Sequence, residues 1–261
     1  MRSKQPQLLL SVLTLLVLFS CTKKTEEFTS EPLSDYMPLQ VGKSIVYRLD
    51  STVFVNFGTQ LEVHSYQEKQ VVDAKISDNL GRDSYRILRF IRDTAGIQPW
   101  APTGSFFITP TDKTVEVIEN NLRFVKLAYP IAQDHSWRGN GYLSDDPFLS
   151  GYSLNTSGIE FWDYTYSKIN GSLAANGKTY DSVLTVDVVD DSRLANKDNF
   201  MITDPTATIA YVNYLQEHYA KGIGLVEQKF ILWEYQNQTP SQPNAGKKVG
   251  FGVKRLIIDH N

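Results

Sequence analysis

Short segments rich in β-branched and aromatic residues recur along this chain and constrain its fold more than any other feature. Several of them alternate partly between apolar and polar residues, which is the two-residue period of a β-strand. Turn-forming pairs such as Asn176-Gly177 and Asn120-Asn121 follow some of these segments. We therefore predict about ten or eleven strands, including residues 45–55, 84–92, 114–118, 122–128, 159–169, 179–189, 225–235 and 247–258.

Residues 36–261 show neither a linker rich in Gly, Ser and Pro nor a repeat of fixed period, and their length suits one all-β domain. Residues 122–128 carry apolar side chains on both faces, so we expect both sides of the sheet to be covered. We predict a mainly β fold. It is a single antiparallel β-meander curved into a barrel, half-barrel or sandwich, with at most one or two short helices.

Residues 205–221 fit two structures. Asp204 before Pro205 and Gly222 behind the segment are typical helix start and stop signals, and some of its apolar residues fall on one helical stripe. The same segment alternates as a strand and contains Tyr, Val and Thr, which favour β structure. We favour a strand, and a helix stays the alternative.

The N-terminus has the layout of a secretory signal peptide. Arg2 and Lys4 precede an apolar stretch over residues 8–19, which ends before Thr22 and two lysines. A membrane-spanning helix needs about 20 apolar residues, and this stretch is shorter. We expect residues 1–20 to be removed, which places Cys21, the single cysteine of the chain, at the new N-terminus.

The segment Leu18-Phe19-Ser20-Cys21 resembles the lipobox of bacterial lipoproteins, although Phe19 is bulkier than the usual residue. The resemblance implies cleavage before Cys21 and acylation of its N-terminus and thiol; a chance cysteine behind an ordinary signal peptide is the alternative. Two or three acyl chains hold a protein firmly on a bilayer. We expect Cys21 to be the lipid attachment site, residues 21–35 to form a flexible tether, and the chain to be anchored to the membrane.

The mature chain is mildly acidic, because removing residues 1–20 takes away two positive charges from a chain whose formal charge is −3. Nucleic acids and anionic lipid head groups bind clustered Lys and Arg, so we expect no nucleic-acid partner. With Cys21 acylated, no thiol is left for a disulfide, a nucleophile or a metal ligand.

Two glycine-containing motifs resemble nucleotide-binding loops but fit turns better. In residues 171–179, Gly171 and Gly177 are one residue too far apart for a phosphate-binding loop, and a strand pattern follows. Residues 221–228 lack the third glycine of a dinucleotide fingerprint. We predict a hairpin turn at Asn176-Gly177 and a bulge or tight turn at Gly222–Gly224.

No motif defines a catalytic or metal site. Asp134, His135 and Ser136 are adjacent, whereas the members of a catalytic triad converge from separate segments. The other histidines (His64, His218 and His260) are widely spaced, and an acidic turn (Asp187, Asp190, Asp191 and Asp198) lacks the pattern of a calcium-binding loop. We predict no catalytic residue, metal site or cofactor, with adventitious Ca²⁺ at the acidic turn as the alternative.

Aromatic residues make up 12% of the chain. We expect most of them, including Trp100, Trp137, Trp162 and Trp233, to build the core rather than a stacking surface. Residues 133–158 form an unusually long connection between predicted strands, and such connections are often functional. We expect any binding lip to lie there.

Four stretches together resemble uncharacterised outer-membrane lipoproteins typical of Bacteroidetes: residues 36–51, 127–143, 219–228 and 250–261. The resemblance implies an outer-membrane location, facing either the periplasm or the cell surface, and no known activity. We predict a non-catalytic module that binds a small apolar ligand, a glycan or an envelope protein. The alternatives are a structural subunit of an envelope assembly and an enzyme of unknown type.

Overall fold

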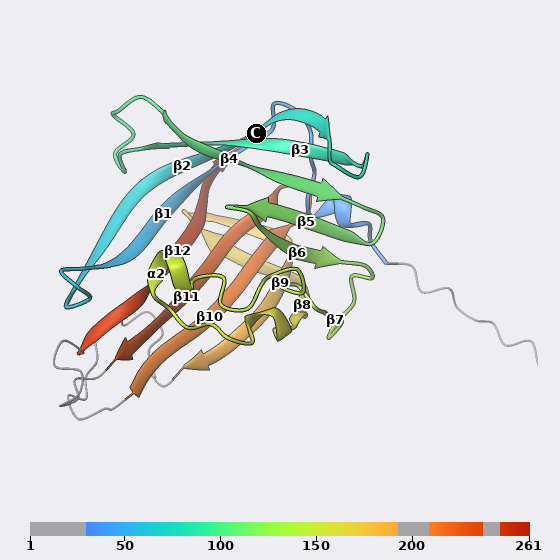
Figure 1. Cartoon of the computed structure of the whole chain (residues 1–261). Coiled ribbons are helices and arrows are strands. Elements are labelled where there is room, and N and C mark those ends of the chain that lie inside the picture. The colour runs from blue at the N-terminus through green and yellow to red at the C-terminus, as the bar shows by residue number, and fades with distance from the viewer. Residues whose placement is uncertain (1–29, 193–208, 237–245) are drawn as a thin grey trace, which may run out of the picture.

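The computed structural model describes residues 30–192, 209–236 and 246–261. In these residues twelve strands form one antiparallel sheet in the order β6-β5-β4-β3-β2-β1-β12-β11-β10-β9-β8-β7 (Figure 1). The strands are β1 (Ser44–Val55), β2 (Gln60–Ser77), β3 (Asp83–Arg92), β4 (Ala101–Pro110), β5 (Thr114–Glu119), β6 (Leu122–Ala128), β7 (Ser136–Trp137), β8 (Tyr164–Ala175), β9 (Lys178–Ser192), β10 (Ile209–Ala220), β11 (Gly224–Gln236) and β12 (Lys247–His260).

The sheet is a meander in which the first and last strands also pair with each other. Neighbours in the sheet follow one another in the chain, except that β1 pairs with β12. The two free edges are therefore β6 and β7, and they meet at a seam. There the Val125 amide donates to the Gly139 carbonyl at 2.8 Å, and the Trp137 indole N–H donates to the Val125 carbonyl at 2.8 Å. The sheet is thus nearly closed into a barrel, which confirms the predicted fold class.

Most predicted strands are present with small shifts of their ends. Residues 209–220 form β10, so the strand is confirmed there, whereas residues 205–208 lie outside the described part of the chain. Two expectations need correction. Residues 159–161 form the 3₁₀ turn η2 (Ile159–Phe161), and β8 starts at Tyr164. The described residues also contain more strands than predicted, because β2, β4 and the short β7 were missed.

The chain packs against the sheet from its first described residues. The 3₁₀ turn η1 (Leu33–Asp35) buries Leu33, and the following Tyr36 is fully buried. Ser30 is held as well, since the Ile131 amide donates to its hydroxyl at 2.7 Å. Ordered contacts thus begin inside the segment expected to be a tether. The expected signal peptide, residues 1–20, and the expected lipid attachment site, Cys21, lie outside the described residues.

The largest cluster of buried side chains lies inside the barrel. Because side chains alternate across a strand, every second residue of each strand points inward. The largest cluster combines these inward residues with Leu33 and Tyr36 from the N-terminal segment. Its strand members include Val72, Ile87, Phe106, Ile108, Val117, Leu127, Tyr164, Tyr166, Leu184, Val186, Leu215 and Tyr219.

The long connection after β7 contributes to a second cluster of buried side chains. It contains the single-turn helix α2 (Leu149–Tyr152) and η2, and it crosses the face of the sheet in Figure 1. Its buried side chains Leu143, Phe148, Leu154 and Ile159 cluster with Leu232 and Phe251 of β11 and β12. We call residues 138–163 the plug.

Both glycine motifs form turns. Asn176 and Gly177, with φ values of 50° and 73°, connect β8 to β9 as a two-residue hairpin turn. Gly222 and Gly224 lie in the turn between β10 and β11, with φ values of 77° and 116°. The two turns confirm the predictions for these motifs.

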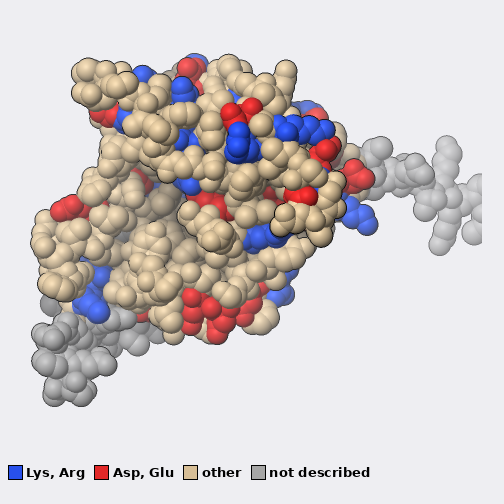
Figure 2. Space-filling view, turned by 45° about the horizontal axis from the view of Figure 1, so that its top comes forward, with Lys and Arg blue, Asp and Glu red and all other residues tan. Residues whose placement is uncertain are grey.

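Charged side chains of both signs are spread over the surface. On the face shown in Figure 2, Lys and Arg form small groups separated by uncharged residues, and Asp and Glu gather along the lower edge. Among the described residues, no helix combines the length and apolar character required to cross a bilayer.

Candidate functional site

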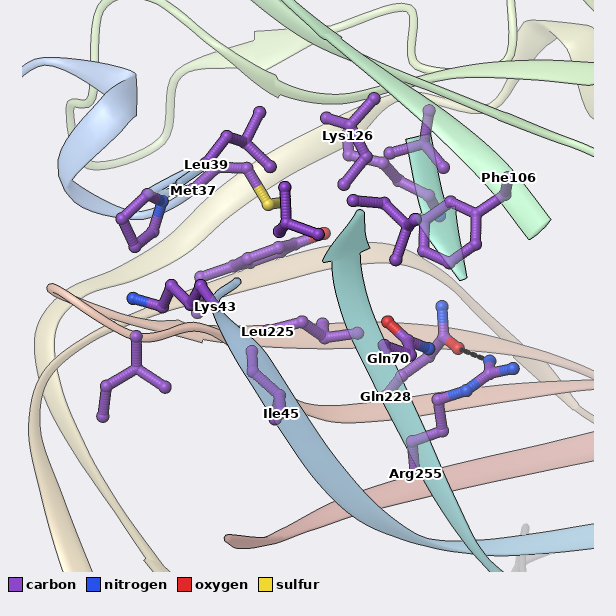
Figure 3. A pocket seen from close by; sticks show the side chains of 18 of the residues that line it. Met37, Leu39, Lys43, Ile45, Gln70, Phe106, Lys126, Leu225, Gln228 and Arg255 are labelled. Carbon is purple, nitrogen blue, oxygen red and sulfur yellow. Dashed lines mark hydrogen bonds between the residues drawn. The ribbon is translucent and has the colours of Figure 1, made fainter. Parts of the chain in front are cut away.

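A pocket lies inside the curved sheet, at the barrel end where β1 begins and β12 ends (Figure 3). The space between protein atoms there amounts to about 780 Å³, part of it open to solvent. The lining passes from half-buried residues at the opening to fully buried residues inside. We call the half-buried residues Met37, Pro38, Leu39, Lys43, Ile45 and Ile223 the rim.

Short backbone hydrogen bonds fix the rim to the sheet. The Gly42 amide donates to the Val72 carbonyl at 2.8 Å, and the Val72 amide donates to the Lys43 carbonyl at 2.9 Å. The Gly222 amide donates to the Asp35 carbonyl at 2.6 Å, which joins the N-terminal segment to the β10–β11 turn. Met37 and Leu39 pack against the main core cluster. The N-terminal segment therefore forms one wall of the opening.

Behind the rim, apolar side chains form one side of the pocket. They come from four consecutive strands, β2 to β5, and from the start of β11. These residues are Val72, Ile87, Phe106, Ile108, Val117 and Leu225. An apolar surface of this kind favours an apolar ligand, because each buried methylene group contributes about 0.8 kcal/mol.

Opposite these residues, polar side chains form a continuous hydrogen-bonded wall. Lys126 of β6 donates to Glu217 Oε1 of β10 at 2.7 Å, and Gln228 Nε2 of β11 donates to the same oxygen at 2.7 Å. Tyr219 donates its hydroxyl to Glu217 Oε2 at 2.7 Å. Each carboxylate oxygen of Glu217 thus has a donor inside the protein, although the residue is fully buried.

The wall continues from Gln228 to the other edge of the pocket. Arg255 Nη1 donates to Gln228 Oε1 at 2.5 Å, and Arg255 Nε donates to Glu68 Oε2 at 2.6 Å (Figure 3 shows the first of these bonds). Arg89 lies 4.0 Å from Glu68 and donates to Glu119 Oε1 at 2.5 Å. Cations and carboxylates therefore alternate along the wall.

These pairings hold the buried groups in their charged forms. Burial disfavours the ammonium of Lys126, but the carboxylate of Glu217 outweighs burial and raises the pKa of Lys126 above its ordinary value. Burial likewise opposes the ionised form of Glu217, and Lys126 outweighs it and lowers the pKa of Glu217. The pKa of Glu68 is lowered in the same way, with Arg255 as the compensating charge. At neutral pH the wall consists of ion pairs.

The histidines, the Asp134–Ser136 segment and the acidic residues considered in the sequence do not line this pocket, whereas Ile223, Gly224, Leu225 and Gln228 of the second glycine motif do. Each histidine has a different neighbour: His64 lies beside Glu62, His218 beside Glu227, His135 beside Trp137 and His260 beside Tyr180. Ser136 shares a hydrogen bond with Thr165 rather than with its neighbour His135. Among the described residues, no group of three or more His, Cys, Asp and Glu is placed to hold a metal ion.

The expected acidic turn is largely a strand. Asp187, Asp190 and Asp191 lie within β9, and Asp198 lies outside the described residues. Asp187 accepts a hydrogen bond from Gln216, and Asp191 accepts one from Tyr211.

The four tryptophans occupy different surroundings, and the described lining of the pocket contains none of them. Trp233 is fully buried, Trp137 lies in the seam, and Trp162 packs against the plug cluster. Trp100 lies under the cationic groups of Lys69 and Arg92.

The loop over residues 133–158, where any binding lip was expected, contributes to the core. Its buried apolar residues pack into the barrel as part of the plug, and none of the described pocket-lining residues belongs to it. The expectation rested on loop length and did not consider the apolar residues that the loop carries. Leu143, Phe148 and Leu154 make it part of the core.

Sequence reasoning missed the polar wall. The available signal was Lys126, a charged residue with the apolar residues Val125 and Leu127 on either side of it. Such a residue is either exposed or paired inside. Its partner Glu217 is 91 residues away in the chain, so only the fold brings the two together.

Comparison with known proteins does not assign this chain to a family. No protein-family model and no curated protein matches the chain. Among solved structures, a DUF1329 family protein from Desulfovibrio piger has 10% identity and a TM-score of 0.18, covering 89% of this chain and 93% of its own. A putative outer membrane lipoprotein-sorting protein domain from Vibrio parahaemolyticus has 10% identity and a TM-score of 0.17, covering 84% and 85%. These values establish neither a common fold nor a shared function.

Proposed function

We propose that the protein is an exported, lipid-anchored binding module that holds a small ligand with an apolar body inside its sheet. The observation that carries this proposal is the pocket, which combines an apolar side, a fixed rim and a polar wall. Concave, mostly apolar sites with a few polar groups are the usual form of small-molecule sites.

The state of the polar wall supports binding rather than catalysis. A general acid or base works best with a pKa near the operating pH. In the wall, the pKa of Lys126 is raised and the pKa values of Glu217 and Glu68 are lowered, so all three move away from neutrality. The hydrogen bonds of Lys126 to Glu217 and of Arg255 to Glu68 give these residues a structural role.

The anchoring part of the proposal rests on Cys21 and the apolar segment before it. Cys21→Ser should move the protein from the membrane fraction to the soluble fraction of the cell envelope. Intact-mass measurement of the native protein should give a chain that starts at Cys21 and carries acyl groups. An untrimmed chain, or a free thiol at Cys21, would contradict this part alone.

The binding part can be tested on the full chain carrying Cys21→Ala, which has no acyl chains to occupy the pocket. We expect the neutral fluorescent probe N-phenyl-1-naphthylamine to bind saturably at one site. Ile45→Trp should abolish this binding, because Ile45 lies on the rim and a larger side chain there fills the opening.

Val63→Trp is the matched control, since Val63 is another aliphatic strand residue but is exposed and away from the pocket. It should leave probe binding unchanged. Thermal unfolding of both variants checks that they are folded. Equal probe binding by wild type and Ile45→Trp would refute the pocket as the binding site.

A further inference from the structure

We infer that the ligand is a single-chain anionic amphiphile of the fatty-acid type, with its apolar chain inside the pocket and its charged head group at the rim beside Lys43. This inference rests on the proposed binding function and specifies the ligand class. The argument depends on how the charges around the pocket are paired.

Inside the pocket, every cation has a carboxylate partner. Lys126 is paired with Glu217, and Arg255 is paired with Glu68 behind the lining. Glu119, the remaining acidic residue of the lining, is paired with Arg89. These three pairs balance one another, so the interior offers a ligand no net charge.

Lys43 is the exception. It is the one pocket-lining cation without a carboxylate within ion-pair distance among the described residues. Its ammonium donates to the Gly222 carbonyl at 2.6 Å, which uses one of its three N–H groups. Partial burial disfavours the charge and lowers the pKa of Lys43. An anion beside Lys43 would offset this cost and fill its free donor positions.

The position of Lys43 sets the orientation of the ligand. Figure 3 shows its nitrogen at the outer side of the pocket, away from Gln70, Gln228 and Arg255 at the inner side. A head group at Lys43 keeps contact with water, while the chain enters past Met37 and Ile45 toward Phe106. The opposite orientation would bury an anion against a wall whose donors already serve Glu217 and Glu68.

Only a short segment of chain separates the described domain from the expected anchor. Ser30 is held to the domain, and nine residues along the chain separate it from Cys21, a reach of at most about 30 Å. With Cys21 acylated, the opening of the pocket stays near the bilayer. Amphiphiles with one acyl chain are found there, which makes the membrane the supply of this ligand.

The test uses three probes with the same twelve-carbon chain and different head groups. Dodecanoate, dodecan-1-ol and dodecyltrimethylammonium are titrated calorimetrically, below their aggregation concentrations, into the full chain carrying Cys21→Ala. We expect dodecanoate to bind about 10-fold more tightly than the alcohol, and the cationic probe to bind most weakly. Added salt should weaken dodecanoate and leave the alcohol unchanged, because Lys43 is partly exposed.

Lys43→Gln retains an unbranched side chain with a hydrogen-bond donor, one atom shorter than lysine, but removes its charge. In this variant dodecanoate should bind no more tightly than the alcohol, and the affinity for the alcohol should stay the same. Lys178→Gln is the control for net charge, since Lys178 is exposed at the β8–β9 turn outside the pocket. It should retain the full preference for dodecanoate.

The outcomes separate the two proposals. Similar affinities for all three probes, or an equal loss for all three in Lys43→Gln, would overturn the head-group assignment and leave the pocket as an apolar binding site. No binding of any probe would overturn the proposed function as well. A preference for dodecanoate that persists in Lys43→Gln would place the anion elsewhere and refute the role of Lys43.

Discussion

Lys126 and Glu217 form an ion pair across the interior of the barrel, with the lysine Nζ 2.7 Å from the glutamate Oε1. Lys126 lies on β6 at one free edge of the sheet, and Glu217 lies on β10, which is not a neighbour of β6. The pair therefore connects two parts of the sheet that no strand pairing joins. Both residues also line the pocket, so the same pair belongs to the core and to the proposed binding site.

Removing one member of this pair should destabilise the protein strongly. Lys126→Met leaves the fully buried Glu217 without its cation, which we expect to lower the free energy of unfolding by about 3–5 kcal/mol. The double variant Lys126→Met with Glu217→Gln removes both charges, so its loss should be smaller than the sum of the two single losses. Urea unfolding of the three variants measures this difference.

Lys75→Met is the control for that experiment. Lys75 lies 2.7 Å from Asp83, the same distance as in the buried pair, but both side chains are at least half exposed. Water screens the exposed pair, so its removal should have little effect on unfolding. Equal losses for Lys75→Met and Lys126→Met would show that burial of the Lys126–Glu217 pair is unimportant.

The ion pairs also predict how stability depends on pH. The pKa of Glu217 is lowered below its ordinary value of 4.5, so the folded state binds its proton less readily than the unfolded state. The stabilisation is complete above this ordinary value and is lost as the pH falls toward the folded-state pKa. Glu68 acts in the same direction. The raised pKa of Lys126 matters only in strong alkali, because its contribution is retained at and below its ordinary value of 10.5.

We therefore expect the free energy of unfolding to fall as the pH is lowered from about 5 to about 3. Urea unfolding across this range measures the fall. Glu217→Gln, which cannot titrate, should show a weaker dependence on pH than the wild type. If the two proteins lost stability in parallel, titration of Glu217 would not be part of the acid response.

The plug should be part of the core rather than a mobile lip. Phe148 is buried against Phe251 and Phe230, with ring centres 5.2 and 5.9 Å apart. Phe148→Ala should lower the free energy of unfolding by about 3 kcal/mol or more. Phe161→Ala is the control in the same segment, because Phe161 is 65% exposed, and it should change stability by less than about 0.5 kcal/mol. Similar effects of both changes would argue against a packed plug.

The seam between β6 and β7 depends on a glycine. A Cβ atom at Gly139 would overlap the ring of Tyr164, which is fully buried and donates to Asn140 at 2.9 Å. Gly139→Ala should therefore destabilise the protein by about 1–3 kcal/mol. Thermal unfolding can compare it with Gly151→Ala, where a Cβ meets nothing within 4 Å. Equal melting temperatures for the two variants would mean that the seam relaxes easily.

The strands that sequence analysis found and those it missed differ in composition. Segments such as β6 and β9 combine β-branched or aromatic residues with clear turn signals at their ends, so local preference and the fold agree. β2 was missed because its polar residues fall on both faces, including Glu68 and Gln70 inside the barrel. β4 was missed because Pro102 and Gly104 are unfavourable in strands.

The pocket could be predicted much less well than the fold. Its wall combines Lys126, Glu217, Gln228 and Arg255 with Glu68 behind the lining, which come from five strands and form no local motif. A polar residue with the two-residue period of a strand can face either side, and the pattern does not distinguish an ion pair inside the barrel from a residue in water.

The sequence by itself determined that the chain forms a single β-rich domain and where several of its tight turns lie, because strand period and turn chemistry are local properties. Only the tertiary structure decided that the sheet closes through β1 and β12, that the plug is core, and that Lys43 alone among the described pocket-lining cations has no carboxylate partner. These features depend on contacts between residues far apart in the chain, whose energies appear only when the sheet curves and brings its inner faces together.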